Sequence, residues 1–170
     1  MKLENYIRSI KDFPIEGVVF RDITTLLQDA KGLNLSIELF AKELYNIEFD
    51  LVVGPESRGF IFGVPLAYKM GKGFVPVRKP GKLPYKVITE SYDLEYGNNS
   101  IEMHVDAIKS GQKVIIVDDL LATGGTLKAT AKLIEKLGGE VVKIISLIEL
   151  EELKGKDSLK EYNVSSLFKF

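Results

Sequence analysis

The sequence predicts an α/β fold, with a central parallel sheet flanked by helices. Short apolar runs alternate with segments of helical period from about residue 50 to residue 148. Such alternation is typical of a parallel sheet that helices cover on both faces. The run Val114-Ile-Ile-Val117 is rich in β-branched residues, and its apolar character predicts a strand buried on both faces.

Two helices are predicted before the first strand. Four apolar residues near the N-terminus follow helical spacing: Leu3, Tyr6, Ile7 and Ile10. Phe13-Pro14 ends this helix, because the residue before a proline avoids the helical conformation. A second helix is predicted over residues 33–45, with three residues directed inward: Leu35, Leu39 and Phe40.

The remaining segments complete the alternating series. Strands are predicted over residues 50–53, 74–77, 100–105, 114–117 and 141–148, and helices over residues 59–70 and 125–137. Gly138-Gly139 provides the C-cap of the last helix. Residues 85–95 alternate with many polar side chains, which indicates an exposed hairpin rather than a core strand. We expect a single domain over residues 1–170, without an internal linker.

The rare residue types limit the chemistry of the site. The chain has no cysteine, which excludes thiolate nucleophiles and cysteine-bound metals. It has one histidine, His104, which excludes a site with several histidine ligands and is expected on the surface of a strand. Any metal is therefore a hard cation held by oxygens, and magnesium carried by a phosphate-rich substrate fits best.

Charge and hydropathy exclude several partners. Basic and acidic residues number 23 and 24, so no overall field attracts nucleic acid or a membrane surface. No apolar run approaches the ~20 residues that cross a membrane. The N-terminus lacks the apolar core of a signal peptide, and we expect a cytoplasmic protein.

The segment from Val114 to Thr126 carries the strongest functional signal. A buried strand leads into Asp118 and Asp119, and a loop with paired glycines and two threonines then opens a helix. Backbone N–H groups of a glycine-rich turn at a helix N-terminus favour a phosphate. The two carboxylates suit hydroxyl groups or a metal ion.

Four interpretations of this segment compete. It could be a buried strand with an ordinary turn and a helix cap. A P-loop would require G-x-x-x-x-G-K-[ST], but no Gly-Lys pair of this chain is followed by Ser or Thr. A dinucleotide site would require G-x-G-x-x-G, which Gly124-Gly125 does not supply. The fourth is the signature for phosphoribosyl diphosphate (PRPP), which the segment resembles at every position.

Further segments extend the resemblance to the adenine phosphoribosyltransferases, within the type I phosphoribosyltransferase family. They are Asp12-Phe-Pro, Gly17-Val-Val-Phe-Arg-Asp-Ile-Thr24, Gly54-Pro-Glu-Ser-Arg-Gly-Phe60, Val77-Arg-Lys-Pro-Gly-Lys-Leu-Pro84 and Leu94-Glu-Tyr-Gly97. They occur in the family's order over nearly the whole chain. Thr25 departs from the pattern, which usually has proline there.

The resemblance implies a fold and an activity. It implies a type I phosphoribosyltransferase fold with a small N-terminal hood over the base site, about residues 1–35, and a flexible hairpin lid, the catalytic loop, about residues 82–97. The implied reaction is the purine-salvage conversion of adenine and PRPP to AMP and diphosphate, with Mg²⁺ delivered by PRPP. A homodimer is also implied, with residues near Arg78 supporting the partner's site.

Two other functions stay open. A phosphoribosyltransferase for another purine is disfavoured by the Phe20-Arg-Asp-Ile element. A non-catalytic regulator that senses PRPP would need a nucleic-acid-binding domain or a basic face, which the sequence does not show.

The resemblance assigns roles in substrate binding. Asp118 and Asp119 hold the ribose 2′- and 3′-hydroxyls and are the candidate metal ligands, either directly or only through the ribose. The 5′-phosphate is bound by a loop of five residues: Ala122, Thr123, Gly124, Gly125 and Thr126. Adenine is bound by three residues of the N-terminal segment: Val19, Phe20 and Arg21. Phe20 would stack on the purine; the alternative is an ordinary core aromatic residue.

Roles in catalysis follow in the same way. Arg58, with Ser57 beside it, binds pyrophosphate, a task suited to the fixed donors of a guanidinium. The cations of the next loop, Arg78, Lys79 and Lys82, alternate with Pro80 and Gly81, which favours a shaped anion-binding loop over a solvated charge run. Glu95 is the candidate general acid or base near adenine N7, and Tyr96 closes over the ribosyl group. Arg58, Lys82 and Glu95 are the predicted catalytic residues. The family also implies a cis peptide bond between Glu56 and Ser57.

Overall fold

The structure is a computed structural model that describes residues 3–93 and 97–170. The chain divides into two compact units, Met1–Glu43 and Leu44–Phe170. Glu95 and Tyr96, which were predicted to act in catalysis, lie outside the described residues.

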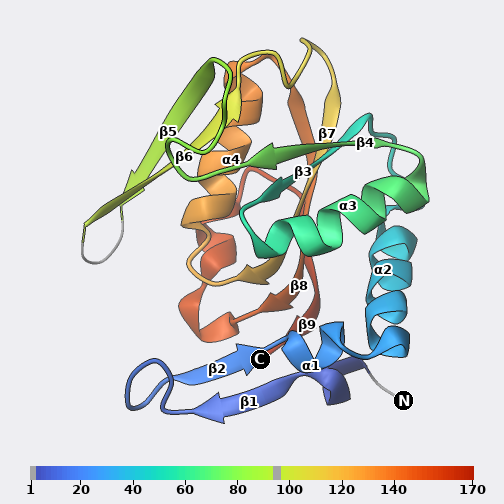
Figure 1. The fold of residues 1–170 in the computed structure, drawn as a ribbon, viewed down its shortest axis with the longest axis vertical. Helices are drawn as coiled ribbons and strands as arrows, with labels where there is room; N and C mark the ends of the chain where they lie inside the picture. Colours follow the sequence, from blue (N-terminus) through green and yellow to red (C-terminus); the bar gives the residue numbers. More distant parts are fainter. Residues whose placement is uncertain (1–2, 94–96) are drawn as a thin grey trace. The chain divides into compact units, whose positions relative to one another are not determined.

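The N-terminal unit is built on a small antiparallel hairpin (Figure 1). Its elements are the 3₁₀ turn η1 (Leu3–Tyr6), strands β1 (Arg8–Lys11) and β2 (Val19–Asp22), and helices α1 (Thr24–Leu27) and α2 (Ala30–Leu44). The helix predicted over residues 3–10 is therefore wrong beyond its first turn. Its apolar spacing covers only two turns, and cross-strand pairing from Arg8↔Asp22 to Lys11↔Val19 outweighs so short a pattern.

Helix α2 confirms the second predicted helix but begins earlier. The Asp29 carboxylate accepts hydrogen bonds of 2.9 Å from the N–H groups of Lys31 and Gly32. This cap makes the helix begin at Ala30, one turn before the predicted start at residue 33. Phe40 is buried as predicted, but Leu35 is 37% exposed. Five helical residues separate Leu35 from Phe40, about 140° around the axis, so the two cannot share one narrow face.

The larger unit contains a five-stranded sheet in which all pairs are parallel, in the order β4-β3-β7-β8-β9. The strands are β3 (Leu51–Pro55), β4 (Gly73–Val77), β7 (Lys113–Leu121), β8 (Glu140–Glu149) and β9 (Val164–Lys169). The helices are α3 (Arg58–Met70) and α4 (Gly125–Lys136), followed by the 3₁₀ turns η2 (Glu151–Leu153) and η3 (Gly155–Leu159). The predicted alternation and the parallel sheet are confirmed; β9 was not predicted.

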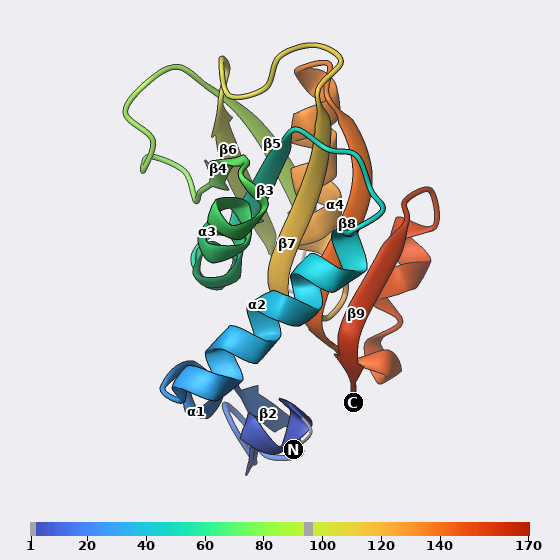
Figure 2. The same cartoon turned by 90° about the vertical axis from the view of Figure 1, so that its right-hand side faces the viewer.

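Helices α3 and α4 cover opposite faces of the sheet (Figure 2). From the central pair, β3 leads through α3 to β4, whereas β7 leads through α4 to β8 on the other side. Crossovers between parallel strands are right-handed. A connection to the next strand on one side of the sheet therefore places its helix on one face, and a connection toward the other side places its helix on the opposite face.

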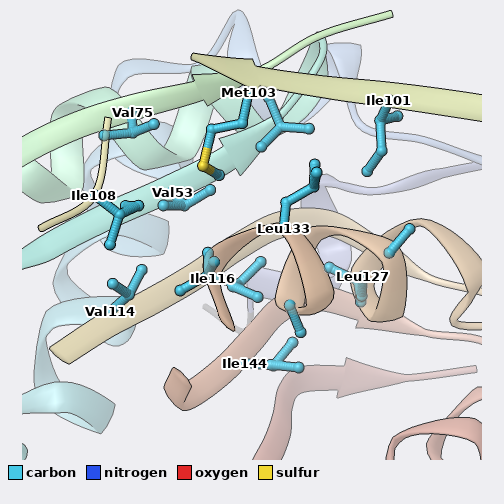
Figure 3. Close-up of a cluster of buried hydrophobic side chains, with 14 of the residues drawn as sticks. Val53, Val75, Ile101, Met103, Ile108, Val114, Ile116, Leu127, Leu133 and Ile144 are labelled. Carbon is cyan, nitrogen blue, oxygen red and sulfur yellow. The ribbon is translucent and has the colours of Figure 1, made fainter. Parts of the chain in front are cut away.

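The core between the sheet and α4 is closed by a second hairpin, β5 (Val87–Asp93) and β6 (Asn98–His104) (Figure 3). Ile101 and Met103 of β6 are buried in this core with Val53 of β3, Ile116 of β7 and Leu133 of α4. Residues 85–95 were predicted as an exposed hairpin, but Ile88 and Tyr92 of β5, which lie on one face of the strand, are partly buried against this core. In the part of the chain that the structure describes, no helix is long and apolar enough to cross a membrane.

Candidate active site

The candidate site lies where the two central strands end. Strands β3 and β7 are neighbours, and their helices leave toward opposite faces, so a crevice opens at their carboxyl ends. A pocket of about 370 Å³ occupies this position. It is lined by three groups of residues: Glu56, Ser57 and Arg58 after β3; Asp118, Asp119 and Leu120 on β7; and residues 122–127, with Lys79 beside them.

The two acids lie within β7 rather than after it. Pairing with β8 continues from Asp118↔Ser146 to Leu121↔Glu149, so the prediction that the strand ends at Val117 is wrong. The reason is that β8 has ten residues and offers pairing partners beyond the apolar run. Asp118 and Asp119 therefore have backbones held by the sheet, and their side chains point to alternate sides.

Each acid has a defined electrostatic environment. Burial, together with the neighbouring Asp119 carboxylate, raises the pKa of Asp118 well above its ordinary value. The Asp118 side chain accepts a 2.8 Å hydrogen bond from the N–H of Asp119. Asp119 is 6% exposed and forms an ion pair of 2.6 Å with Nε of Arg58. The predicted pyrophosphate ligand thus lies beside the predicted ribose ligand.

The loop predicted to bind phosphate begins α4. Gly124 has a φ of 87°, a conformation that glycine adopts without strain, and its carbonyl accepts the first helical bond from the N–H of Lys128 at 2.9 Å. All five predicted residues, 122–126, line the pocket. The N–H groups at the start of this helix have no partners within the helix and suit an anion.

A turn of the chain supports this loop from behind. A Cβ on Gly155 would lie 2.8 Å from Leu121 Cδ1 and 3.1 Å from the carbonyl carbon of Ala122, so only glycine fits there. The hydroxyl of Ser158 lies 2.8 Å from the carbonyl oxygen of Gly155 and 3.2 Å from that of Thr123, so its hydrogen ties the two segments together. These contacts fix the backbone of the phosphate loop; sequence reasoning did not identify them.

The basic loop after β4 is organised by Glu56. Its carboxylate accepts a 2.8 Å hydrogen bond from the N–H of Lys79, forms an ion pair with Lys82 and lies 3.4 Å from Nε of Arg78. Burial pushes the pKa of Glu56 upward, but the hydrogen bonds from the Lys82 side chain and the Lys79 N–H, with the charges of Lys82 and Arg78, outweigh it and hold that pKa below its ordinary value. Lys79 reaches the pocket, and Lys82 is bound to Glu56.

Two further predictions concern the backbone and the only histidine. The peptide bond between Glu56 and Ser57 is cis, which confirms the prediction. His104 lies at the end of β6, where Nε2 accepts a 3.3 Å hydrogen bond from the N–H of Tyr85. His104 is therefore a strand residue, as predicted, and it does not line the pocket described above.

The residues predicted to bind adenine lie on β2 of the N-terminal unit. Val19 is 43% exposed, and Phe20 packs edge-to-face against Phe13 with ring centroids 5.2 Å apart. Arg21 donates a hydrogen bond to the hydroxyl of Ser9. The Thr25 hydroxyl donates to the carbonyl of Tyr6, a bond that the proline usual in the family could not make.

Among the described residues, no group of three or more His, Asp or Glu residues could hold a metal ion. Asp118 and Asp119 alone offer too few oxygens for a protein cage, but they suit a cation whose other ligands are phosphate oxygens and water. The residues present thus fit magnesium that arrives with a phosphorylated substrate.

Sequence and structure comparisons agree with this geometry. Residues 23–170 match the family described as phosphoribosyl transferase domain. The chain therefore belongs to the phosphoribosyltransferases, a class of pentosyl-transferring enzymes, and its parallel sheet with helices on both faces is the type I fold of that class.

The chain belongs more narrowly to the adenine phosphoribosyltransferase family. It is 59% identical to the adenine phosphoribosyltransferase of Lachnoclostridium phytofermentans over 99% of this chain and 97% of the relative. A crystal structure of the enzyme from Thermoanaerobacter pseudethanolicus superimposes with a TM-score of 0.96 at 56% identity, over 99% of this chain and 100% of that one. The yeast enzyme, solved with an iminoalditol bisphosphate and adenine, has a TM-score of 0.92 at 37% identity, over 97% of this chain and 96% of that one.

Proposed function

We propose that this protein transfers the phosphoribosyl group of PRPP to adenine, producing AMP and diphosphate. One observation carries the proposal. A single pocket brings together two carboxylates, a phosphate-binding helix N-terminus and the cation Arg58, which are the groups that a ribose, its 5′-phosphate and a diphosphate need.

The substrate ends are assigned to opposite sides of this pocket. The 5′-phosphate binds the loop from Ala122 to Thr126, and the carboxylates of Asp118 and Asp119 accept hydrogen bonds from the ribose hydroxyls. The diphosphate binds Ser57, Arg58, Arg78 and Lys79, and Lys82 closes on it from the same basic loop.

The chemistry needs oriented charge more than a nucleophile. Positive charge develops on the ribose ring and negative charge on the departing diphosphate, so fixed cations lower the barrier by meeting the developing anion. Arg58 and Lys82 supply this charge. Their positions are set by Asp119 and Glu56, with which they form ion pairs.

Magnesium supports the same step. When bound with the diphosphate, it neutralises phosphate charge, and Asp118 or Asp119 is the protein group available to it. We assign the base to Val19, Phe20 and Arg21, and the general acid or base to Glu95, with Tyr96 covering the ribosyl group. The unit at about residues 1–35 then acts as the hood of the base site, and residues 82–97 as the catalytic loop.

The protein acts as a homodimer in this proposal. Helix α3 carries an exposed apolar stripe at helical spacing: Ile61, Val64 and Tyr68, of which Tyr68 is 89% exposed. A second copy of the chain would cover such a stripe. Sedimentation of the protein as a dimer, and of a Val64→Glu variant as a monomer, would support this assembly; a monomeric parent protein would contradict it.

The activity test measures AMP by chromatography after incubation with PRPP, magnesium and one base. Adenine should be converted, and omission of magnesium should abolish turnover. Equal turnover of hypoxanthine or guanine would indicate a transferase for another purine. PRPP binding without turnover of any base would indicate a regulator that senses PRPP.

A further inference from the structure

Tyr92 connects the hairpin β5–β6 to the loop that the proposed function assigns to the 5′-phosphate. Its hydroxyl lies 2.8 Å from Oγ1 of Thr126, the last residue of that loop. The Tyr92 ring packs against Gly125, the residue before Thr126: a Cβ on Gly125 would lie 3.0 Å from Tyr92 Cδ2 and 3.4 Å from Cε2. Tyr92 was not among the residues that the sequence singled out for the site.

Two further contacts fix the strand that carries Tyr92. Glu90, two residues earlier on the same face, forms ion pairs with Lys136 and, at 3.6 Å, with Lys132 of α4. The hydrogen bond from Lys136 holds the pKa of Glu90 below its ordinary value. Strand β5 therefore runs along α4, the helix whose first turn forms the phosphate loop (Figure 1).

The direction of the hydrogen bonds follows from Asn99. Asn99 pairs directly with Tyr92 across the hairpin, and its Nδ2 donates to the Tyr92 hydroxyl at 3.3 Å. A phenol has a single hydrogen to donate. Among the described residues, Asn99 and Thr126 are the only hydrogen-bond partners of this hydroxyl, so the Tyr92 hydrogen goes to Oγ1 of Thr126.

The consequence falls on Thr126. Because its oxygen accepts from Tyr92, its own single hydrogen stays available for another acceptor. Thr126 lines the pocket beside the N–H groups of the helix start. A phosphate there offers only acceptor oxygens, so a hydroxyl whose hydrogen is already turned away from Tyr92 needs no reorganisation to bind it.

We propose that Tyr92 is a positioning residue for phosphoribosyl binding: the chain of hydrogen bonds from Asn99 through Tyr92 orients the Thr126 hydroxyl as a donor to the 5′-phosphate. The proposal rests on the proposed function, because it takes the loop 122–126 as the 5′-phosphate site. It adds a residue of the hairpin stem whose effect on the phosphate is exerted through Thr126.

The test separates the two ends of PRPP by titrating ribose 5-phosphate and magnesium diphosphate in a calorimeter. Tyr92→Phe keeps the ring against Gly125 and removes only the hydroxyl. It should weaken ribose 5-phosphate binding about five- to tenfold, the range of a misdirected hydrogen bond to a charged group. Diphosphate binding, kcat and the KM for adenine should stay within about twofold, while the KM for PRPP rises in parallel.

A double-mutant cycle identifies Thr126 as the intermediary. Thr126→Val should weaken ribose 5-phosphate more than Tyr92→Phe does, and adding Tyr92→Phe to Thr126→Val should change nothing further. Thr126→Ser, which keeps the hydroxyl, should bind like the parent protein. Tyr45→Phe is the matched control, because Tyr45 follows α2, is 82% exposed and does not line the pocket.

Several outcomes would overturn the proposal. Unchanged ribose 5-phosphate binding in Tyr92→Phe would remove the role of the hydroxyl. Equal weakening of ribose 5-phosphate and diphosphate would mean that Tyr92 only holds the fold. Independent effects of Tyr92→Phe and Thr126→Val would break the link between them. A parent protein that binds neither ligand would refute the proposed function and this inference together, whereas failure confined to the variants refutes the inference alone.

Discussion

Replacing Gly155 by alanine should damage substrate binding from outside the pocket. Gly155 is buried behind the phosphate loop and has no left-handed φ, so alanine introduces no backbone strain there. The added methyl group would lie 3.1 Å from the carbonyl carbon of Ala122 and closer still to the carbonyl oxygen. Since carbon and oxygen approach only to about 3.3 Å, one of the two segments must move by about 1 Å.

The size of the effect follows from that displacement. The obstacle is backbone rather than the end of a flexible side chain, and Leu121 Cδ1 at 2.8 Å closes the other direction. Overpacking of this kind costs about 1–3 kcal/mol in stability. A shift of about 1 Å in a substrate-positioning segment can reduce catalysis about 100-fold, so kcat/KM for PRPP should fall by about that factor.

Steady-state kinetics with varied PRPP, together with thermal unfolding, would measure both effects. Gly73→Ala is a suitable control, because a methyl group there meets only the end of the Leu51 side chain, at 3.0 Å. The control should retain its kinetics. A folded Gly155→Ala protein with parental kcat and KM for PRPP would show that the turn at Gly155 does not determine the loop's position.

Four further predictions follow from the structure. Asp119→Asn should weaken PRPP binding at least tenfold while changing the unfolding free energy by at most about 1 kcal/mol, since its partner Arg58 is half exposed; a large loss of stability with intact PRPP affinity would contradict the assigned role. Hydrogen bonds from the Thr24 N–H and from Arg8 lower the pKa of Asp22 from 3.8 to about 2, so its stabilisation is complete above pH 3.8 and is lost as the pH falls through 2. Asp22→Asn should therefore lower the unfolding free energy by about 1–2 kcal/mol in urea titrations at pH 7, allowing for the exposed Arg8, and parent and variant should converge near pH 2. Adenine should exceed guanine by roughly 10⁴ in kcat/KM, because a carbonyl in place of the amino group leaves buried polar groups unmatched; comparable turnover of guanine would refute the base assignment. Hydrogen exchange should find the strands β5 and β6 protected without added ligand, since buried side chains and ion pairs to α4 hold them; fast exchange in both strands would instead support a hairpin that is mobile along its whole length.

The segments that the sequence predicted well are those whose signal is local and strong. The apolar run before Asp118 and the glycine pair after it predicted β7, the phosphate loop and α4 together, because burial, turn geometry and helix start all lie within thirteen residues. Helix α3 was predicted almost to the residue despite Pro65, because Gly71 marks its end with a φ of 66°.

The missed elements depend on distant partners. Strand β9 reads Val-Ser-Ser-Leu-Phe-Lys, without alternation, and forms only by pairing with β8 at one edge of the sheet. The hairpin β1–β2 offers four residues per strand, too few for a period to be read. In the site, the role of Glu56 as the anchor of the basic loop rests on contacts 23 and 26 residues away, which no local pattern records.

The ion pair between Arg58 and Asp119 makes two groups assigned to the substrate compete with it as partners of each other. The group assigned to diphosphate is held by a group assigned to ribose, so a ligand that engages either one must first draw it from the other. Ribose 5-phosphate alone, or diphosphate alone, must break this ion pair while binding only one of its two members. Intact PRPP breaks the ion pair once and binds both members at the same time. The binding of PRPP should therefore be more favourable than the sum of the binding free energies measured for ribose 5-phosphate and for diphosphate. The excess should be larger than the usual advantage of joining two ligands in one molecule. The protein thereby favours the whole substrate over its hydrolysis fragments.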